Sequence, residues 1–158
     1  VRAGPLPHYR NMRGLETRGA VWITVEALGT KVQVLNTHLG LIPAEQRQQA
    51  AALVADWMAS EAWKAPAILL GDFNAGPYSK TYRMLNAALK DAQTLTPYTP
   101  ICTFPSKLPF MRIDHVFLAG PWKVMKIEAP YAGAARVASD HLPLVVELDL
   151  PPEPAPAP

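Results

Sequence analysis

Alternating apolar and polar positions predict two neighbouring strands near the start of this chain. Residues 21–26 read Val-Trp-Ile-Thr-Val-Glu, and the alternation resumes at Val32 and Val34 and runs to Thr37. A period of two places every second side chain on the same face, as in a strand with one buried face. The segment Leu-Gly-Thr at residues 28–30 separates the two runs and has the composition of a turn, so we expect a β-hairpin.

Helical spacing follows the hairpin. Pro43 suits the first turn of a helix. One face of that helix then recurs at Gln46, Ala50, Leu53 and Trp57. A second helix is expected after Ser79, whose side chain can cap it. The inward residues of the second helix are Tyr82, Leu85 and Leu89.

The remaining elements complete a mixed sheet. The continuous apolar run at residues 67–70 predicts a strand covered on both faces. Three further strands are expected at residues 113–118, 122–127 and 144–149. Residues 1–19 and 95–109 are expected to be loops, because glycine and proline interrupt any periodicity there. The order of elements indicates an α/β (α+β) fold in which a mixed β-sheet carries its helices on one face.

Composition and charge are those of an ordinary globular domain. Of the 158 residues, 49% are apolar, which is enough for one hydrophobic core, and we expect one domain over residues 1–150. Residues 151–158, Pro-Pro-Glu-Pro-Ala-Pro-Ala-Pro, have the composition of a polyproline tail. The net charge of +2 and the lack of a dense basic stripe give no indication of nucleic-acid binding, although they leave it open.

Three absences bear on location. Cys102 is the single cysteine, which excludes an internal disulfide and favours a reducing compartment such as the cytoplasm. No apolar run is long enough to cross a membrane. No signal peptide is visible, and because the chain begins at Val1 rather than methionine, we allow for upstream sequence that has been removed.

Four polar segments interrupt the apolar pattern at the ends or starts of expected strands. They are Asn-Thr-His-Leu-Gly with His38, Gly-Asp-Phe-Asn with Asp72 and Asn74, Arg-Ile-Asp-His-Val-Phe with Arg112 and Asp114, and Ser-Asp-His-Leu-Pro with Asp140 and His141. If the first and last strand pairs run in opposite directions, these segments meet on one rim of the sheet. Taken singly, each has a simpler explanation: a hydrogen-bonding histidine, an Asx turn or a helix cap. His115 has the opposite parity to Asp114, and we interpret it as structural.

In combination, these groups are typical of phosphoryl chemistry. Carboxylates bind a hard divalent cation that neutralises phosphate charge, and a carboxylate near phosphorus can take a proton from water. An amide can orient that water without adding negative charge. A histidine paired with an aspartate can stabilise a transition state through a charged hydrogen bond. No serine elbow, cysteine–histidine pair, zinc-type cluster or glycine-rich phosphate loop competes with this interpretation.

The four segments, in this order, resemble the endonuclease/exonuclease/phosphatase superfamily of deoxyribonuclease-like, metal-dependent phosphoesterases. The matching motifs are Thr-His-Leu-Gly, Gly-Asp-Phe-Asn, Ile-Asp-His-Val-Phe and Ser-Asp-His-Leu-Pro, within residues 16–149. The resemblance implies five catalytic residues, namely His38, Asp72, Asn74, Asp114 and His141. It implies ligands for Mg²⁺ or Mn²⁺ at Asp72, Asn74 and Asp140. It also leads us to expect substrate contacts from Asn74, His38 and Arg112.

The resemblance gives these residues separate tasks. His38 would contact the scissile phosphate, Asp72 would bind or activate the attacking water, and Asn74 would orient it. Asp114 would fix and charge His141, which would face the phosphate.

The chain departs from the family in one respect. The family fold is a four-layer α/β/β/α sandwich, and this chain has strands for about half of it. An asparagine in the first strand and a glutamate, usually in a Gln-Glu pair, are both missing. We therefore interpret the chain as the C-terminal half of the fold, which should pair with the N-terminal half or with a second copy through its exposed sheet face.

Two functions stay open. One is a divalent-metal-dependent hydrolase of phosphodiester or phosphomonoester bonds, active in the complete protein. The other is a non-catalytic half-fold that pairs with itself or a partner. The substrate is open among DNA, RNA, lipids and small phosphate esters, with DNA ranked slightly lower because the chain lacks a basic stripe. The wording Thr-His-Leu-Gly-Leu is closer to bacterial members of the family.

Overall fold

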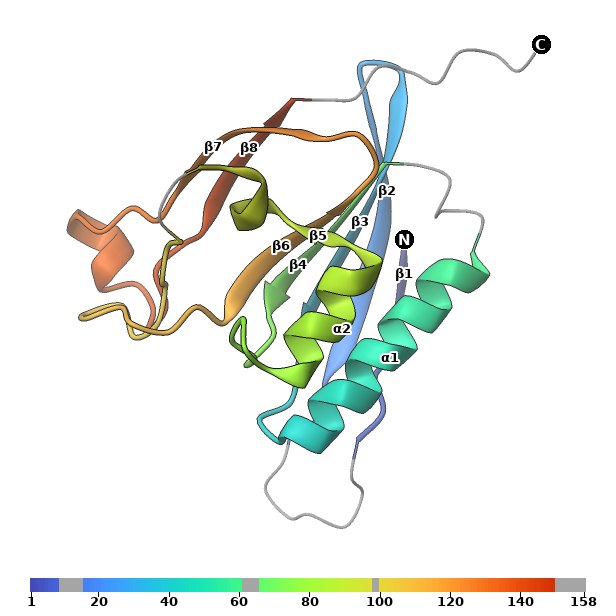
Figure 1. The fold of residues 1–158 in the computed structure, drawn as a ribbon, viewed down its shortest axis with the longest axis horizontal. Helices are drawn as coiled ribbons and strands as arrows, with labels where there is room; N and C mark the ends of the chain where they lie inside the picture. The colour runs from blue at the N-terminus through green and yellow to red at the C-terminus, as the bar shows by residue number, and fades with distance from the viewer. Residues whose placement is uncertain (9–15, 61–65, 98–99, 150–158) are drawn as a thin grey trace.

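A six-stranded sheet forms the centre of the molecule, in the order β1-β2-β3-β4-β6-β5 (Figure 1). The computed structural model describes residues 1–8, 16–60, 66–97 and 100–149. The strands of the sheet are β1 (Arg2–Pro5), β2 (Gly19–Ala27), β3 (Thr30–His38), β4 (Ala67–Asp72), β5 (Lys90–Asp91) and β6 (Asp114–Ala119). Strands β3 and β4 run parallel and every other neighbouring pair is antiparallel. The sheet is therefore mixed, as predicted.

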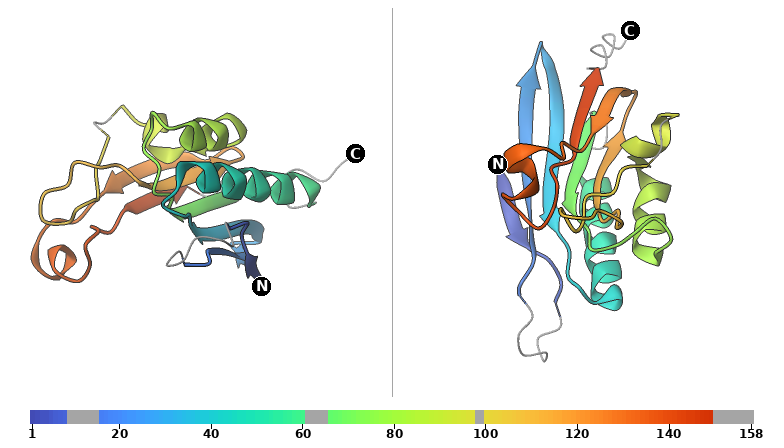
Figure 2. Two further views of the ribbon diagram at one scale, coloured as in Figure 1. Left: turned by 90° about the horizontal axis from the view of Figure 1, so that it is seen from below. Right: turned by 90° about the vertical axis from the view of Figure 1, so that its left-hand side faces the viewer.

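Two helices, α1 (Pro43–Ala59) and α2 (Lys80–Ala88), lie on the same face of this sheet (Figure 2). Both begin as the sequence predicts. Pro43 occupies the first turn of α1, where a backbone N–H would have no partner within the helix. The Ser79 side chain accepts a hydrogen bond from the Tyr82 N–H and so caps α2. The expectation of helices on one face is confirmed.

The hydrophobic core lies between these helices and the sheet face that they cover. The register aligns one row of core side chains across four strands, Trp22, Leu35, Leu69 and Phe117. Leu53 and Trp57 of α1 and Leu85 of α2 belong to the same core. Trp57 stacks on Trp22 with ring centroids 5.7 Å apart.

The opposite face of the sheet is much less covered. Val21 and Val25 are 44% and 39% exposed, and Val34, Ile68 and Leu70 are half-buried. We refer to the surface formed by these five residues as the open face. The expectation that the strand at residues 67–70 is covered on both faces is wrong, because only alternate residues of β4 reach the core beneath the helices.

The last two strands do not join the central sheet. Strands β7 (Lys123–Glu128) and β8 (Val145–Asp149) pair with each other as a separate antiparallel ribbon. Their sequence pattern predicts strands but not the partner, which packing decides. Strand β1 was also unexpected, since residues 1–19 carry no alternation. It follows from pairing with β2, where Arg2 lies opposite Trp22.

Loops and short turns complete the chain. The described part of residues 95–109 is largely loop, as predicted, between a 3₁₀ turn at Ala92–Leu95 and an isolated bridge from Phe104 to Met111. A second 3₁₀ turn at Gly133–Arg136 lies between β7 and β8. Within the described residues, no helix combines the length and apolar character needed to cross a membrane. The expected tail at 151–158 lies outside the described residues.

Candidate functional site

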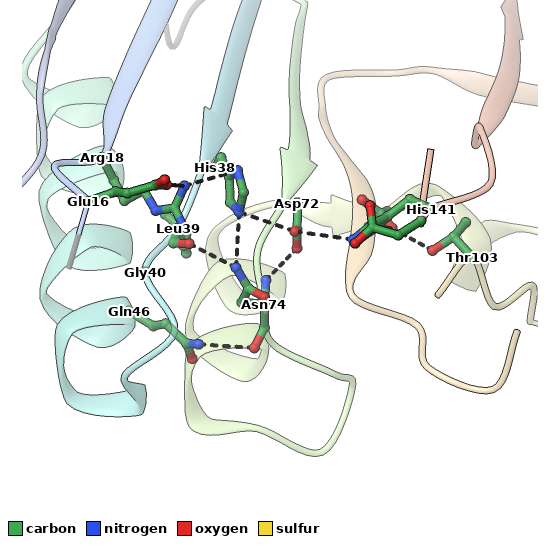
Figure 3. A network of polar contacts seen from close by, with 12 residues as sticks. Glu16, Arg18, His38, Leu39, Gly40, Gln46, Asp72, Asn74, Thr103 and His141 are labelled. Atoms are coloured by element: carbon green, nitrogen blue, oxygen red, sulfur yellow. Dashed lines mark hydrogen bonds and ion pairs between the residues drawn. The ribbon is translucent and has the colours of Figure 1, made fainter. Parts of the chain in front are cut away.

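Three of the expected site residues lie on one line across the sheet. The register of β3 and β4 places His38 beside Asp72, and the register of β4 and β6 places Asp72 beside Asp114. Strands β3 and β4 end at the rim where the antiparallel β6 begins, so backbone pairing alone brings an imidazole and two carboxylates together. Figure 3 shows the His38 and Asp72 side chains at this rim.

Gly71 allows the ends of β3 and β4 to approach closely. Its φ is +140°, and a Cβ atom there would lie 1.8 Å from the backbone oxygen of Thr37. Any other residue would therefore collide with β3 one position before His38. This contact explains why a glycine directly precedes Asp72.

Asn74 ties the two strand ends together. Its N–H donates to Asp72 Oδ1 at 2.8 Å, and its side-chain Nδ2 donates to the Leu39 carbonyl at 3.0 Å. Its φ of +48° is left-handed, a conformation that asparagine tolerates better than most residues. The same Nδ2 lies 3.1 Å from His38 Nε2 (Figure 3).

His38 lies between a carboxylate and a guanidinium. Its Nε2 is 3.3 Å from Asp72 Oδ2, and its Nδ1 is 3.2 Å from Arg18 Nη1. A guanidinium only donates, so Nδ1 accepts from Arg18, while Nε2 faces both the Asp72 carboxylate, an acceptor, and the Asn74 side-chain amide nitrogen, a donor. Arg18 also pairs with Glu16 at 3.0 Å. The His38 side chain is 49% exposed, so a substrate can reach it.

His141 comes from the loop that precedes β8. Its Nδ1 donates to Asp114 Oδ2 at 2.7 Å, and its Nε2 lies 3.8 Å from Asp72 Oδ2. The Thr103 hydroxyl donates to the same Asp114 oxygen. The Phe104 ring packs against the imidazole with centroids 4.7 Å apart. The loop before β6 therefore fixes the orientation of both Asp114 and His141.

The surroundings of Asp72 make it more basic. Burial raises the pKa of its carboxyl, and the Asp114 carboxylate raises this pKa further. The Asn74 N–H and the two histidines, His38 and His141, act in the opposite direction without cancelling the rise. A carboxylate with a raised pKa holds a proton more readily, which suits a general base.

The surroundings of His141 favour its charged form. Burial alone would lower the pKa of the imidazole, but the hydrogen bond to Asp114 and the charges of Asp114, Asp72 and Asp140 raise it overall. When both ring nitrogens carry protons, Nδ1 serves Asp114 and Nε2 is left as a charged donor at the rim.

The Asp140 side chain does not belong to the cluster of Asp72, Asp114 and His141 at the rim. Its side chain is exposed and accepts from the Ser139 hydroxyl at 3.3 Å, and its backbone oxygen accepts from the Ser106 N–H. The described acidic and histidine side chains that come together as a candidate ligand group are Asp72, Asp114 and His141. The expected ligand Asp140 therefore lies outside this group and acts on His141 through its charge.

Arg112 lies buried in the interior and not at the rim, contrary to the expectation that it contacts the substrate. Its guanidinium is buried, donates to the Asp91 carboxylate and the Tyr82 hydroxyl, and lies over the Tyr82 ring. A buried carboxylate requires a paired cation, and Arg112 is that cation for Asp91. His115, interpreted as structural, is buried in the same cluster with its Nδ1 3.1 Å from Asp91 Oδ2.

The donors at the rim fit a hard divalent cation. One ligand atom each from Asp72, Asp114 and His141 lies within 4.8 Å of the others. Mg²⁺ and Mn²⁺ prefer oxygen ligands, which points to the two carboxylates, since His141 is engaged with Asp114. Two adjoining carboxylates repel each other, and a cation between them would remove that repulsion.

Sequence reasoning missed three contributors to the site, Thr103, Phe104 and Arg18. Thr103 and Phe104 lie in the loop expected at residues 95–109, and the length of this loop, which is typical of functional loops, is the one sequence feature that points to them. Arg18 precedes β2 and is not among the site residues predicted from the sequence. Its contact with His38 spans two strands and leaves no periodic trace in the sequence.

Comparison with known families agrees with this geometry. A model of the endonuclease/exonuclease/phosphatase family matches residues 3–141. The chain belongs to this family. The matched region runs from β1 to His141. It contains the first three polar segments and the Ser-Asp-His part of the fourth, so the resemblance inferred from them is confirmed.

A curated relative is longer than this chain. The Escherichia coli K12 protein YbhP, described as uncharacterized, is 31% identical over 156 residues. The alignment covers 92% of this chain and 60% of YbhP. The chain therefore spans less than two thirds of the length of the curated relative that it matches.

Solved structures share the fold. Mannosyl-6-phosphatase Bt3783 from Bacteroides thetaiotaomicron superposes with a TM-score of 0.78 at 21% identity, over 95% of this chain and 66% of that one. A functionally unknown conserved protein from Enterococcus faecalis V583 gives 0.77 at 23% identity, over 94% and 66%. Humanized D. rerio TDP2 gives 0.71 at 15% identity, over 95% and 67%. The fold class predicted from the sequence is confirmed.

Proposed function

We propose that this chain carries the catalytic half of a divalent-metal-dependent hydrolase of phosphodiester or phosphomonoester bonds. The line of His38, Asp72 and Asp114 across three strands, in a member of this family, is the observation that supports it most. Adjacent carboxylates repel each other and destabilise a fold unless a positive charge neutralises them. A divalent cation would neutralise both carboxylates and would bind the phosphate ester at the same place.

Asp72 and Asn74 act on the attacking water. Asp72 takes its proton, because its Oδ2 is the carboxylate oxygen that faces the Nε2 atoms of both histidines at the rim. Asn74 fixes one Asp72 oxygen through its N–H and adds an uncharged amide beside the phosphate. A divalent cation held by Asp72, Asp114 and Asn74 would neutralise phosphate charge when bound.

The two histidines donate hydrogen bonds to phosphate oxygens. Both present an Nε2 toward Asp72, at 3.3 Å from His38 and 3.8 Å from His141. His141 is the stronger donor, because Asp114 favours its charged form and charged donors stabilise developing negative charge more than neutral ones. Asp114 thus serves His141 as well as the cation.

The test uses the full-length protein that contains this chain. Bis-p-nitrophenyl phosphate and p-nitrophenyl phosphate report on diesters and monoesters, and the monoester is included because the structural neighbour Bt3783 is named a phosphatase. We expect release of nitrophenol with Mg²⁺ or Mn²⁺ and none with a chelator. Lack of turnover of both esters, together with no Mg²⁺ binding by calorimetry, would overturn the proposal.

The open face supports a second function, that of a half-fold that pairs through this surface. Val21 and Val25 are exposed on this sheet face, and an exposed apolar patch can serve as an interaction surface. We propose as its partner the N-terminal half of the family fold or, in its absence, a second copy.

Val21→Glu should abolish self-association of the 158-residue chain in light scattering. Leu28→Glu, at the exposed hairpin turn, is the matched control. A wild-type monomer at all concentrations would contradict self-association.

A further inference from the structure

Asn74 holds a costly backbone conformation in the middle of the site. Two non-glycine residues of the described chain have positive φ, Leu28 and Asn74. Leu28 lies in the exposed turn between β2 and β3, whereas Asn74 lies beside Asp72. A left-handed non-glycine residue persists only where its surroundings hold it. The contacts that hold Asn74 therefore decide whether its N–H reaches Asp72 Oδ1.

Gln46 holds the carbonyl group of Asn74 itself. Its Nε2 donates to Asn74 O at 3.0 Å (Figure 3). Gln46 lies in the first turn of α1 and is 3% exposed, so water does not replace it easily. The bond is part-buried, and a shielded carbonyl that loses its donor is left with an unsatisfied acceptor, which makes this bond a constraint on the Asn74 peptide group.

His115 holds the next carbonyl group along the chain. Its Nε2 lies 2.9 Å from Ala75 O, and because a carbonyl only accepts, Nε2 is the donor. The other ring nitrogen faces Asp91, which also receives Arg112. His115 is thus anchored in a buried ion cluster on β5 and β6, while Gln46 reaches in from α1.

We propose that Gln46 and His115 are positioning residues that clamp the two peptide groups following Asn74. The clamp keeps Asn74 left-handed, with its N–H on Asp72 Oδ1 and its side chain on Leu39 O. This inference rests on the proposed function, in which Asn74 and Asp72 act on the attacking water. Release of the clamp slows the chemical step and leaves substrate binding largely unchanged.

The test substitutes Gln46→Met in the full-length protein, which keeps the side-chain length and removes the donor. Gln49→Met is the matched control, since Gln49 is equally buried on α1 but bonds Gly40 and Pro7 instead. For Gln46→Met we expect hydrogen exchange at the Asn74 amide to rise about tenfold and kcat to fall about tenfold at unchanged KM, as for one lost hydrogen bond. Gln49→Met should show neither change.

Two further variants complete the test. One removes the His115 bond, and the other is a milder change at Gln46 that can be measured if the Gln46→Met protein does not fold. His115→Phe keeps a ring and removes the donor, and Gln46→Asn keeps the amide but withdraws it by one methylene. Both should accelerate exchange at Asn74.

Equal acceleration in the Gln46→Met and Gln49→Met proteins would overturn the clamp, as would a raised KM at unchanged kcat. Selective acceleration in a wild-type background that hydrolyses no ester would uphold the clamp and refute the proposed function instead.

Discussion

Two aspartate–histidine pairs meet on strand β6 and use the same groups in opposite settings. Asp114 and His115 are consecutive, so their side chains point to opposite faces of the strand. Asp114 bonds His141 at the rim, where their side chains are 19% and 23% exposed. His115 bonds Asp91 in the interior, where both side chains are 0% exposed. Access to solvent and substrate separates a reactive pair from a structural one.

The charges around the acidic groups differ as well. Burial by itself would raise the pKa of Asp91, but its hydrogen bond with His115 and the charges of His115 and Arg112 lower it overall. Burial raises the pKa of Asp72 as well, and the adjoining Asp114 carboxylate raises it further instead of offsetting the rise. A carboxylate among cationic donors stays ionised and holds structure, whereas one beside another carboxylate gains basicity.

Asp72→Asn should have the largest effect on the rim side of this comparison. An amide cannot take a proton from water, so we expect kcat of the full-length protein to fall about 10³- to 10⁴-fold. Hydrolysis of bis-p-nitrophenyl phosphate with Mg²⁺ measures this. The control is Asp56→Asn, at an exposed aspartate of α1 that pairs with Arg2. Comparable losses in the two variants would show that Asp72 has no special role.

Asp91→Asn tests the buried pair. The change leaves Arg112 and His115 without their counter-charge, so the free energy of unfolding should fall by about 3–5 kcal/mol. Urea denaturation measures this, with Asp56→Asn again as control, because an exposed pair contributes about 0–1 kcal/mol. A loss as small as that of the control would mean that the buried cluster stabilises little.

His141→Ala removes the charged donor at the rim. By analogy with the loss of other donors to a developing oxyanion, we expect kcat to fall about 100-fold, or about 3 kcal/mol. Steady-state kinetics on the same diester give the answer. His8→Ala is the control, because His8 is exposed and lies far from His141 in the sequence, and this change should leave kcat unchanged. The role of His141 is refuted by a kcat within twofold of wild type.

The pH dependence of stability sharpens the contrast further. Because the pKa of Asp91 is lower in the folded state, its contribution is fully present above the unfolded-state value of about 3.9. That contribution is lost as pH falls through the lower folded-state pKa. In acid unfolding followed by circular dichroism, the free energy of unfolding should therefore fall less steeply with decreasing pH in the Asp91→Asn protein than in the wild type. Parallel curves for the two proteins would assign the acid sensitivity to other groups.

Local patterns predicted most of the elements. The hairpin of β2 and β3, the start of α1 at Pro43 and the cap of α2 at Ser79 all depend on residues close together in the sequence. Strand partners depend on packing instead. The sequence therefore did not predict that β7 and β8 form their own sheet, or that β1 adds to β2.

The residues of the site also divide into those that the sequence predicted and those that depend on packing. His38, Asp72 and Asp114 were recognisable because strand pairing carries polar residues at strand ends to one rim. Arg112 misled because its partner, Asp91, lies 21 residues away and takes it into the core. Gln46 belonged to an apolar helical face by spacing, and its bond to the carbonyl group of residue 74 could not be anticipated without coordinates.

The kcat of Asp114→Asn with Mg²⁺, compared with that of the wild-type full-length protein, tests the central claim most directly. Asp114 touches both His141 and the candidate cation group, and its side chain is partly exposed. The account predicts that turnover falls at least about 100-fold while the urea midpoint stays close to wild type. A variant that turns over as fast as wild type would show that the rim pair on β6 is not a catalytic centre.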